Sequence, residues 1–286
     1  MNYPQLVECP RDAMQGIHTF IETDKKAAYI NALLKCGFHT IDFGSFVSPK
    51  AIPQMRDTAE VLGKLDLSST TSKLLAIIAN ERGAADAAAF DEISYLGYPF
   101  SISETFQLRN TNATIEESLK RVEEIQKICL QKDKTLVVYI SMAFGNPYGD
   151  PWDASIAINW SNRLAQLGIK VIALADTTGV SNPENIKYLF ENIIPELPEL
   201  TIGAHLHTTP ETWKEKMEAA WNAGCRRFDH ALKGFGGCPM ATDRLTGNMP
   251  AERVLEFFIE KNIDTGINSA AFANAMMLSG KTFPVE

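Results

Sequence analysis

Short apolar runs alternate with longer stretches of helical periodicity from one end of the chain to the other. The run Val171–Ala175 is apolar at every position, which is typical of a parallel strand covered on both faces. The pattern predicts eight strands, at Gln5–Cys9, His39–Phe43, Lys73–Ile78, Glu92–Leu96, Thr135–Ser141, Lys170–Ala175, Thr201–His205 and Arg226–Ala231. Eight strands that each lead into a helix predict an α/β fold, the closed (β/α)8 TIM barrel.

Signals for the starts and ends of helices lie between these runs. Thr114 and Glu117 have the spacing of a capping box, and Pro183 stands just inside another predicted helix. The last barrel helix is predicted at Ala251–Lys261. The Ala- and Met-rich segment Asn268–Ser279 is predicted to form an extra C-terminal helix outside the barrel.

Length and composition agree with a single domain. A TIM barrel typically needs about 250 residues, and no linker or low-complexity segment divides residues 1–286, so we interpret them as one TIM-barrel domain. Apolar residues make up 45% of the chain and charged residues 22%, as in soluble globular proteins. The formal charge of -8 argues against nucleic acid or an anionic membrane as the main partner.

The cysteine pattern and the apolar runs bear on location. Five cysteines are scattered without a CxxC pair, which favours free thiols in a reducing compartment. No apolar run approaches the roughly 20 residues of a membrane span, and the first residues have no signal-peptide pattern. We therefore expect a cytoplasmic protein with no membrane partner.

Polar residues at the ends of three strands indicate a metal site. The active site of a TIM barrel lies where its strands end. The end of the seventh strand reads His205-Leu206-His207, and two residues that are two apart on one strand share a face. Arg11 and Asp12 follow the first strand, and Asn248 lies in the eighth loop. Because the eighth strand closes onto the first, Asp12, His205, His207 and Asn248 can converge. Such nitrogen and oxygen ligands suit Mg²⁺ or Mn²⁺ about as well as Zn²⁺.

Each of these features also has an ordinary structural explanation. A His-x-His pair is often incidental, an Arg-Asp pair after a strand often forms a loop ion pair, and an Asn beside Gly often marks a turn. Their combination on neighbouring strands is what favours the metal site.

A glycine-rich loop and three further carboxylates are also candidates. Gly234, Gly236 and Gly237 could make a mobile lid that carries Cys238 over the barrel mouth, although a flexible linker with an incidental cysteine has the same pattern. Three acidic side chains could tune ligands or proton transfer, or could instead be buried hydrogen-bond anchors. They are Glu8, Asp42 and Asp176.

Taken together, these motifs resemble the hydroxymethylglutaryl-CoA lyase family and, more broadly, the metal-dependent TIM-barrel lyases and condensing enzymes. The resemblance covers nearly the whole chain. SFVSPK at residues 45–50 and GFGGCP at residues 234–239 are the lyase-specific pieces, whereas the His-x-His pair and Asp12 are shared with condensing enzymes and aldolases. Other landmarks are VECPRD at 7–12, Ser103-Glu104, Asn110, Asn112, NPYG at 146–149, ADTTGV at 175–180 and Gly247-Asn248.

The resemblance implies an activity and a set of site residues. The activity is retro-Claisen cleavage of 3-hydroxy-3-methylglutaryl-CoA, or a related 3-hydroxyacyl-CoA, to acetyl-CoA and acetoacetate. The implied ligands of Mg²⁺ or Mn²⁺, with Zn²⁺ as an alternative, are Asp12, His205, His207 and Asn248. The implied catalytic residues are Arg11, Asp12, Asp42, Asp176, His205 and Cys238. The implied substrate contacts are Gln15, Ser45, Asn110, Tyr148 and Thr178. We also expect a homo-oligomer, a dimer.

The chain departs from the family pattern near this site. His18 stands where the family has Lys, Asp42 where it usually has Glu, and Asn146 where it often has Cys. A shift of about 1 Å in a catalytic carboxylate can cost on the order of a hundredfold in rate. These departures leave the ligand set and Cys238 in place, so they bear on the acyl substrate more than on the reaction.

Three other functions remain open from the sequence. The first is a Claisen-type acyltransferase that condenses acetyl-CoA with a 2-oxo acid, and the second is an aldolase on a hydroxy-oxo acid. The third is a barrel that binds a metal or metabolite without turnover, which Asp42 and His18 support best.

Overall fold

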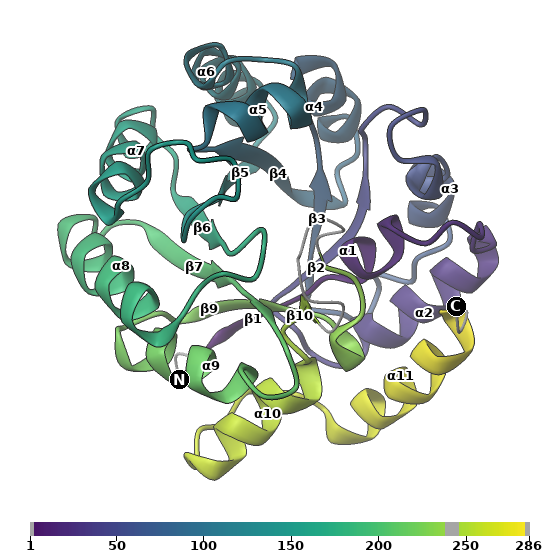
Figure 1. Ribbon diagram of the computed structural model, residues 1–286. Coiled ribbons are helices and arrows are strands. Elements are labelled where there is room, and N and C mark those ends of the chain that lie inside the picture. The colour runs from purple at the N-terminus through teal and green to yellow at the C-terminus, as the bar shows by residue number, and fades with distance from the viewer. Residues whose placement is uncertain (1–2, 238–245, 284–286) are drawn as a thin grey trace.

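The computed structural model describes residues 3–237 and 246–283. Within them eight parallel strands close into a barrel, in the order β1-β2-β3-β4-β5-β6-β7-β9, with helices around it (Figure 1). The predicted TIM barrel is therefore confirmed. Its strands are β1 (Gln5–Glu8), β2 (Thr40–Ser45), β3 (Lys73–Ile77), β4 (Ile93–Ser101), β5 (Thr135–Ser141), β6 (Val171–Ala175), β7 (Thr201–His205) and β9 (Arg227–His230).

The helices follow the predicted alternation. Thr114 and Glu117 form the predicted capping box, and Pro183 occupies the first turn of its helix, behind the cap Asn182. The helices of the outer ring are α2 (Thr23–Leu34), α3 (Thr58–Leu62), α4 (Glu81–Ala88), α6 (Ile115–Gln131), α7 (Ala154–Gln166), α8 (Pro183–Glu196), α9 (Trp213–Asn222) and α10 (Ala251–Glu260). Shorter pieces in the loops are α1 (Pro10–Gln15), α5 (Glu104–Thr111), η1 (Pro53–Met55) and η2 (Leu232–Gly234).

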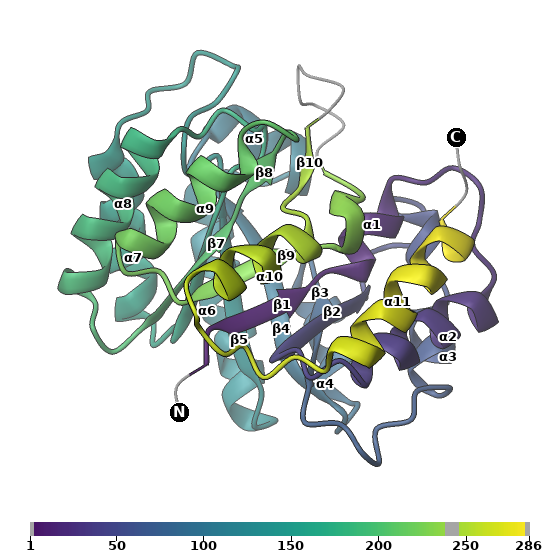
Figure 2. The ribbon, with the colours of Figure 1, turned by 90° about the horizontal axis from the view of Figure 1, so that it is seen from below.

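The extra C-terminal helix is also confirmed. It is α11 (Ser269–Thr282), and it packs along α2 on the outside of the barrel (Figures 1 and 2). None of the helices in the described parts of the chain is both long and apolar enough to cross a membrane.

Strand β4 is longer than predicted. The expected strand ended at Leu96, yet β4 runs to Ser101 and includes Gly97 and Pro99, two residue types that are unfavourable inside a strand. A Cβ atom on residue 97 would lie 2.5 Å from Cδ1 of Ile77, so the missing side chain leaves room for Ile77. Close packing between neighbouring strands has therefore overridden local propensity.

The prediction that His205 and His207 lie on one strand is wrong. β7 ends at His205, and His207 belongs to the short strand β8 (His207–Thr208), which pairs antiparallel with β10 (Gly247–Asn248). His207 lies opposite Asn248 in this pair. The backbone therefore turns after His205, and the pairing of β8 with β10 fixes the backbone of His207.

The two faces of the strands have different surroundings. The main core lies between the strands and the surrounding helices, and it includes Phe228. A second, small apolar cluster includes Leu75 and Tyr139 and faces the barrel interior. Because side chains alternate along a strand, Arg227 and Asp229 lie opposite Phe228 and face the interior too. The interior below the site is therefore partly charged.

Candidate active site

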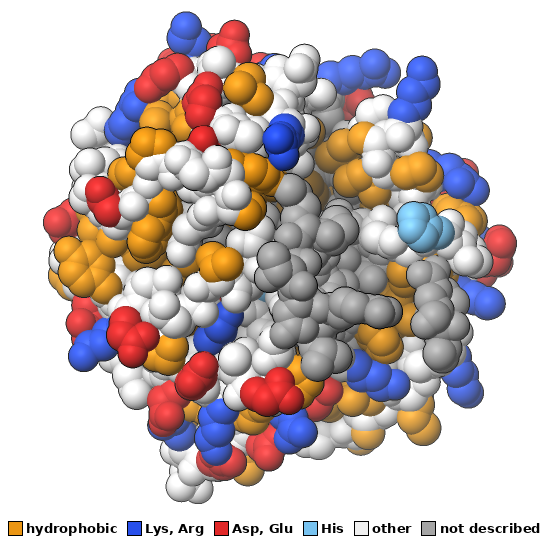
Figure 3. All heavy atoms as spheres, viewed as in Figure 1, with side chains coloured by type: hydrophobic (Ala, Val, Ile, Leu, Met, Phe, Trp, Pro, Cys, Tyr) orange, Lys and Arg blue, Asp and Glu red, His pale blue; other side chains and the backbone are white. Residues whose placement is uncertain are grey.

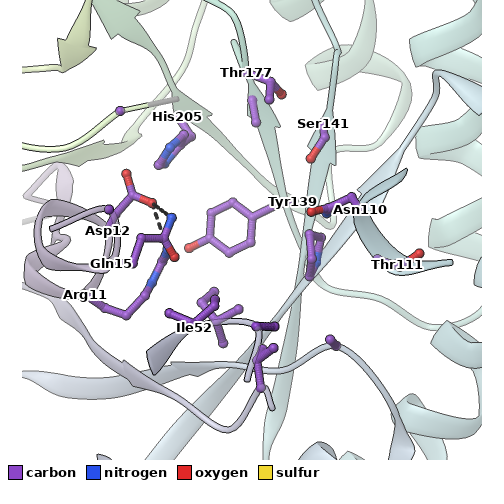
Figure 4. A pocket seen from close by; sticks show the side chains of 18 of the residues that line it. Arg11, Asp12, Gln15, Ile52, Asn110, Thr111, Tyr139, Ser141, Thr177 and His205 are labelled. Atoms are coloured by element: carbon purple, nitrogen blue, oxygen red, sulfur yellow. Dashed lines mark hydrogen bonds and ion pairs between the residues drawn. The ribbon is translucent and has the colours of Figure 1, made fainter. Parts of the chain in front are cut away.

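A cavity of about 490 Å³ lies where the barrel strands end. Figure 3 shows this end of the molecule, on which charged side chains gather mainly around the periphery. Figure 4 shows the cavity with Tyr139 near its centre, Arg11, Asp12 and His205 on one side and Asn110 on the other. Apolar side chains complete the wall, among them Val47, Ala51, Ile52, Ile77, Ala79, Pro99 and Phe106.

Helix α1 places three polar side chains in this cavity. Pro10 begins the helix directly after β1, where its missing N–H costs nothing. Arg11, Asp12 and Gln15 then face the cavity and bond to one another. Arg11 Nη1 donates to Asp12 Oδ1 at 2.7 Å and to Gln15 Oε1 at 2.9 Å, and Gln15 Nε2 donates to Asp12 Oδ1 at 3.0 Å.

The carboxylate of Asp42 binds the same guanidinium. Nε of Arg11 donates to Asp42 Oδ2 at 3.0 Å, and Asp42 is fully buried. Burial raises the pKa of Asp42 to about 6, although the charge of Arg11 opposes the rise. Burial also raises the pKa of Asp12, but the charges of Arg11 and the nearby imidazoles outweigh it and lower that pKa to about 2. Asp12 is therefore ionised at neutral pH.

Asp12, His205 and His207 come together as a candidate metal cluster. One ligand atom from each lies within 4.8 Å of the others, and the centres of the two imidazole rings are 5.4 Å apart. Both ring nitrogens of His207 are buried, and neither makes a hydrogen bond of normal geometry with the residues that the structure describes. A buried polar atom without a partner is costly, and two imidazoles with a carboxylate suit a divalent cation. The residues therefore fit a metal ion.

Asn248 supports Asp12 in this arrangement. Its side-chain N–H group donates to Asp12 Oδ2 at 2.8 Å and to the carbonyl oxygen of Phe235 at 2.8 Å. The antiparallel pair of β8 and β10 brings Asn248 to this place, opposite His207. Here Asn248 acts as a donor to Asp12, and its role as an oxygen ligand stays a prediction.

A second pair of charged residues lies under His205, and the sequence interpretation missed it. Asp229 Oδ2 lies 3.2 Å from Nδ1 of His205, and Asp229 Oδ1 accepts from Arg227 Nη1 at 2.7 Å. Arg227 and Asp229 are buried. The available signal was the spacing of Arg227 and Asp229 by two within the predicted strand, because that spacing puts both side chains on one face.

Asp176, predicted as catalytic, does not line the cavity. Its carboxylate accepts from Lys216 Nζ at 3.0 Å and from the hydroxyl of Ser181 at 2.5 Å. Lys216 also donates to the backbone oxygen of His207 at 2.8 Å. Asp176 therefore supports the wall through a buried lysine, while its neighbour Thr177 lines the cavity.

The other predicted residues divide between the cavity and the surrounding protein. Gln15 and Asn110 line the cavity, whereas Ser45, Tyr148 and Thr178 are not among the lining residues. The ring of Tyr148 packs on Phe106, which does line it. Cys238 lies outside the described residues.

Glu8 lies on the other side of the barrel wall. Its carboxylate is 2.8 Å from Nδ1 of His230 and accepts the backbone N–H of Leu232 at 2.9 Å. His230 in turn packs against Phe38, a member of the main core. Glu8 is therefore a buried anchor between the barrel wall and the helices.

The described part of the glycine-rich loop packs closely against α1. Gly236 has a φ of +83°, and a Cβ atom there would lie 2.6 Å from the backbone oxygen of Asp12. Glycine at this position therefore allows the loop to touch the backbone of a candidate ligand. The lid prediction stays a prediction, because Cys238 is not described.

Comparisons with known proteins identify the family. A sequence model of the HMGL-like family matches residues 5–278. A cytoplasmic 3-hydroxy-3-methylglutaryl-CoA lyase of Rattus norvegicus is 32% identical over 269 residues, covering 93% of this chain and 77% of that protein. An (R)-citramalyl-CoA lyase of Chloroflexus aurantiacus is 30% identical over 275 residues, covering 93% and 86%. A solved HMG-CoA lyase from Acinetobacter baumannii, in complex with coenzyme A and 3-methylmalate, has a TM-score of 0.88 and 32% identity, covering 99% and 93%. The chain therefore belongs to the HMGL-like family.

Proposed function

We propose that this protein is a carbon–carbon lyase that cleaves 3-hydroxy-3-methylglutaryl-CoA, or a related 3-hydroxyacyl-CoA, to acetyl-CoA and an oxo acid, which is acetoacetate when 3-hydroxy-3-methylglutaryl-CoA is the substrate. The observation that carries the proposal is that Arg11 and the buried cluster of Asp12, His205 and His207 line one cavity. The names of the relatives describe lyases for two acyl-CoA substrates of this kind.

The reaction needs two proton transfers and a group that stabilises the negative charge of the enolate. Removal of the proton from the C3 hydroxyl lets the C2–C3 bond break, and C3 becomes a ketone. The electron pair of that bond passes to C2 and the thioester carbonyl as an enolate. A proton then adds to C2, which gives acetyl-CoA, and with the methyl-substituted substrate the ketone is acetoacetate.

Arg11 is proposed to stabilise the enolate oxygen. Its guanidinium is fixed by Asp12 and Asp42 before substrate arrives, and donors held in advance are the effective ones in such sites. Asp42 keeps the carboxylate of the family pattern on a shorter side chain. A divalent cation, with Mg²⁺ or Mn²⁺ proposed and Zn²⁺ as the alternative, would supply further positive charge at the substrate oxygens when bound by Asp12, His205 and His207.

Other groups are also proposed to take part in the reaction. Asn248 is proposed as a further ligand and Cys238 as the group that delivers a proton to C2. Gln15 and Asn110 face the cavity from opposite sides and are proposed to contact the acyl-CoA. We also propose a dimer and, in line with the name of the rat relative, a cytoplasmic location.

The test measures acetyl-CoA release by the purified protein. Metal-free protein receives 3-hydroxy-3-methylglutaryl-CoA or (R)-citramalyl-CoA, with Mn²⁺, with Mg²⁺ or with EDTA. Release that needs metal and is lost in Arg11→Gln supports the proposal. No release from either substrate by folded, metal-loaded protein would overturn it for these substrates.

The same preparation separates the other functions. A Claisen-type acyltransferase would consume acetyl-CoA when a 2-oxo acid is added, and free coenzyme A would appear. An aldolase would cleave hydroxy-oxo acids that carry no coenzyme A. A non-catalytic barrel would bind metal or ligand in calorimetry and turn over none of these compounds.

A further inference from the structure

Asp229 holds one side of the His205 imidazole. Nδ1 of His205 lies 3.2 Å from Asp229 Oδ2, and the ring meets Tyr139 edge-on with 5.8 Å between ring centres. The two nitrogens of an imidazole point in different directions, and a neutral ring carries its proton on one of them. A carboxylate at Nδ1 places the proton there and leaves the lone pair on Nε2.

Asp229 is itself fixed. Its other oxygen, Oδ1, accepts from Arg227 Nη1 at 2.7 Å, and both side chains are at most 3% exposed. The guanidinium keeps Asp229 charged and stops the carboxylate from rotating. Arg227, Asp229 and His205 therefore form a chain of contacts that runs from the barrel interior up to the candidate metal cluster.

The second imidazole has no such support. Neither ring nitrogen of His207 makes a hydrogen bond of normal geometry with the described residues. Its backbone is held instead, through the pairing with Asn248 and the bond from Lys216. One candidate ligand is thus oriented through its ring by a carboxylate, whereas the other is positioned through its backbone.

Cys9 also lies near these groups, and a second metal site is the competing interpretation. A sulfur of Cys9, a nitrogen of His205 and an oxygen of Asp229 lie within 4.8 Å of one another. Cys9 donates to the backbone oxygen of Val7, however, and Asp229 already pairs with Arg227. The group has little negative charge left for a cation, so orientation of His205 is the better explanation.

We infer that Asp229 is a positioning residue, held by Arg227, which keeps the proton of His205 on Nδ1 and directs Nε2 toward a divalent cation shared with Asp12 and His207. Groups that hold a metal-binding imidazole in this way typically change metal affinity 10- to 100-fold when they are altered. The inference deepens the proposed function and rests on it for the divalent cation, while neither of its tests depends on turnover.

The first test needs no variant. The tautomer of His205 is read from ¹H–¹⁵N correlation spectra of metal-free protein with labelled histidine, at a pH where the imidazoles are neutral. His205→Gln identifies the signals. A proton on Nδ1 is expected, and a proton on Nε2 would overturn the inference.

The second test measures Mn²⁺ affinity by calorimetry in the absence of any acyl-CoA. Asp229→Asn should weaken binding about 10- to 100-fold, and Asp229→Glu should recover part of the loss. The matched control is Asp57→Asn, because Asp57 is also a buried acid in an ion pair, with Lys26 at 2.7 Å, away from the cavity. The control should lose stability and keep its Mn²⁺ affinity.

The outcomes separate this inference from the proposed function. Folded Asp229→Asn protein that binds Mn²⁺ as tightly as the wild type would overturn the inference, whatever the enzyme cleaves. Weaker binding in that variant, together with no acyl-CoA cleavage by the wild type, would overturn the proposed function alone. If Asp229→Asn does not fold, the tautomer measured in the wild type decides.

Discussion

Replacing Gly236 with alanine tests whether the glycine-rich loop fixes the position of Asp12. The new Cβ would lie 2.6 Å from the backbone oxygen of Asp12 and 2.7 Å from Cα of Ala13. Ordinary contact begins at 3.4 Å, so the loop or α1 must move by about 0.8 Å. A displacement of about 1 Å at a catalytic group can cost on the order of a hundredfold in rate.

The expected loss of stability has two parts. The φ of +83° at Gly236 is unfavourable for alanine, which costs roughly 1–2 kcal/mol. Crowding against the backbone of α1 adds about 1–3 kcal/mol. Gly149→Ala separates the two, since Gly149 has a φ of +76° and nothing within 4 Å of a Cβ. Gly16→Ala, next to α1, has neither problem.

Denaturant unfolding and Mn²⁺ titration measure these effects, followed by acetyl-CoA release if the proposed activity is found. Gly236→Ala should lose about 2–5 kcal/mol of stability and bind Mn²⁺ more weakly. Gly149→Ala should lose only the stability that the strained φ costs and should keep its metal affinity, and Gly16→Ala should be close to wild type in stability and Mn²⁺ affinity. If Gly236→Ala matched Gly149→Ala in both measurements, the contact with Asp12 would have no consequence.

Three further predictions concern charge and metal. Burial raises the pKa of Asp42 to about 6, so the stability that its protonated form contributes is present below its unfolded pKa and is lost as the pH rises toward 6. In denaturant titrations, Asp42→Asn should lack this decline between about pH 4 and 6, and an unchanged profile would contradict the assignment. Glu8→Gln should lower the free energy of unfolding by about 1–3 kcal/mol, because it breaks a buried pair with His230; a loss of Mn²⁺ affinity would show that Glu8 reaches the site. Mn²⁺ at about 100 times its dissociation constant should stabilise the wild type by roughly 2.7 kcal/mol. The His207→Ala variant should lose most of that gain, and full stabilisation of the variant would place the metal elsewhere.

The strand and helix pattern was readable from the chain because it depends on local features. Continuous apolar runs predicted the parallel strands, and the capping box at Thr114 predicted the start of α6. The largest error in strand length was in β4, where Gly97 and Pro99 argue against a strand. The glycine at position 97 leaves space for Ile77 on the neighbouring strand, and this tertiary contact cannot be predicted from local propensity.

The convergence of the candidate ligands was partly predictable as well. Asp12, His205 and His207 were predicted to converge because the eighth strand closes onto the first, and the structure brings them within 4.8 Å. His207, however, reaches the cluster from the short strand β8 and not from the end of β7. Asp176 lies at the expected end of a strand, but its side chain points toward Lys216. No local pattern in the sequence predicts this pairing, because the two residues are 40 positions apart.

Residue types and their periodicity were thus enough for the barrel, the edge that holds the cavity and most of the candidate ligands, since strand order and side-chain alternation follow from short-range geometry. The supports beneath those ligands depended on packing between distant segments. Asp229 meets His205 because β7 and β9 are neighbours in the closed barrel, and His207 meets Asn248 because β8 pairs with β10. Hydrogen-bond partners of this kind are set by the distances between segments that are far apart in the sequence, and those distances exist only once the chain has folded.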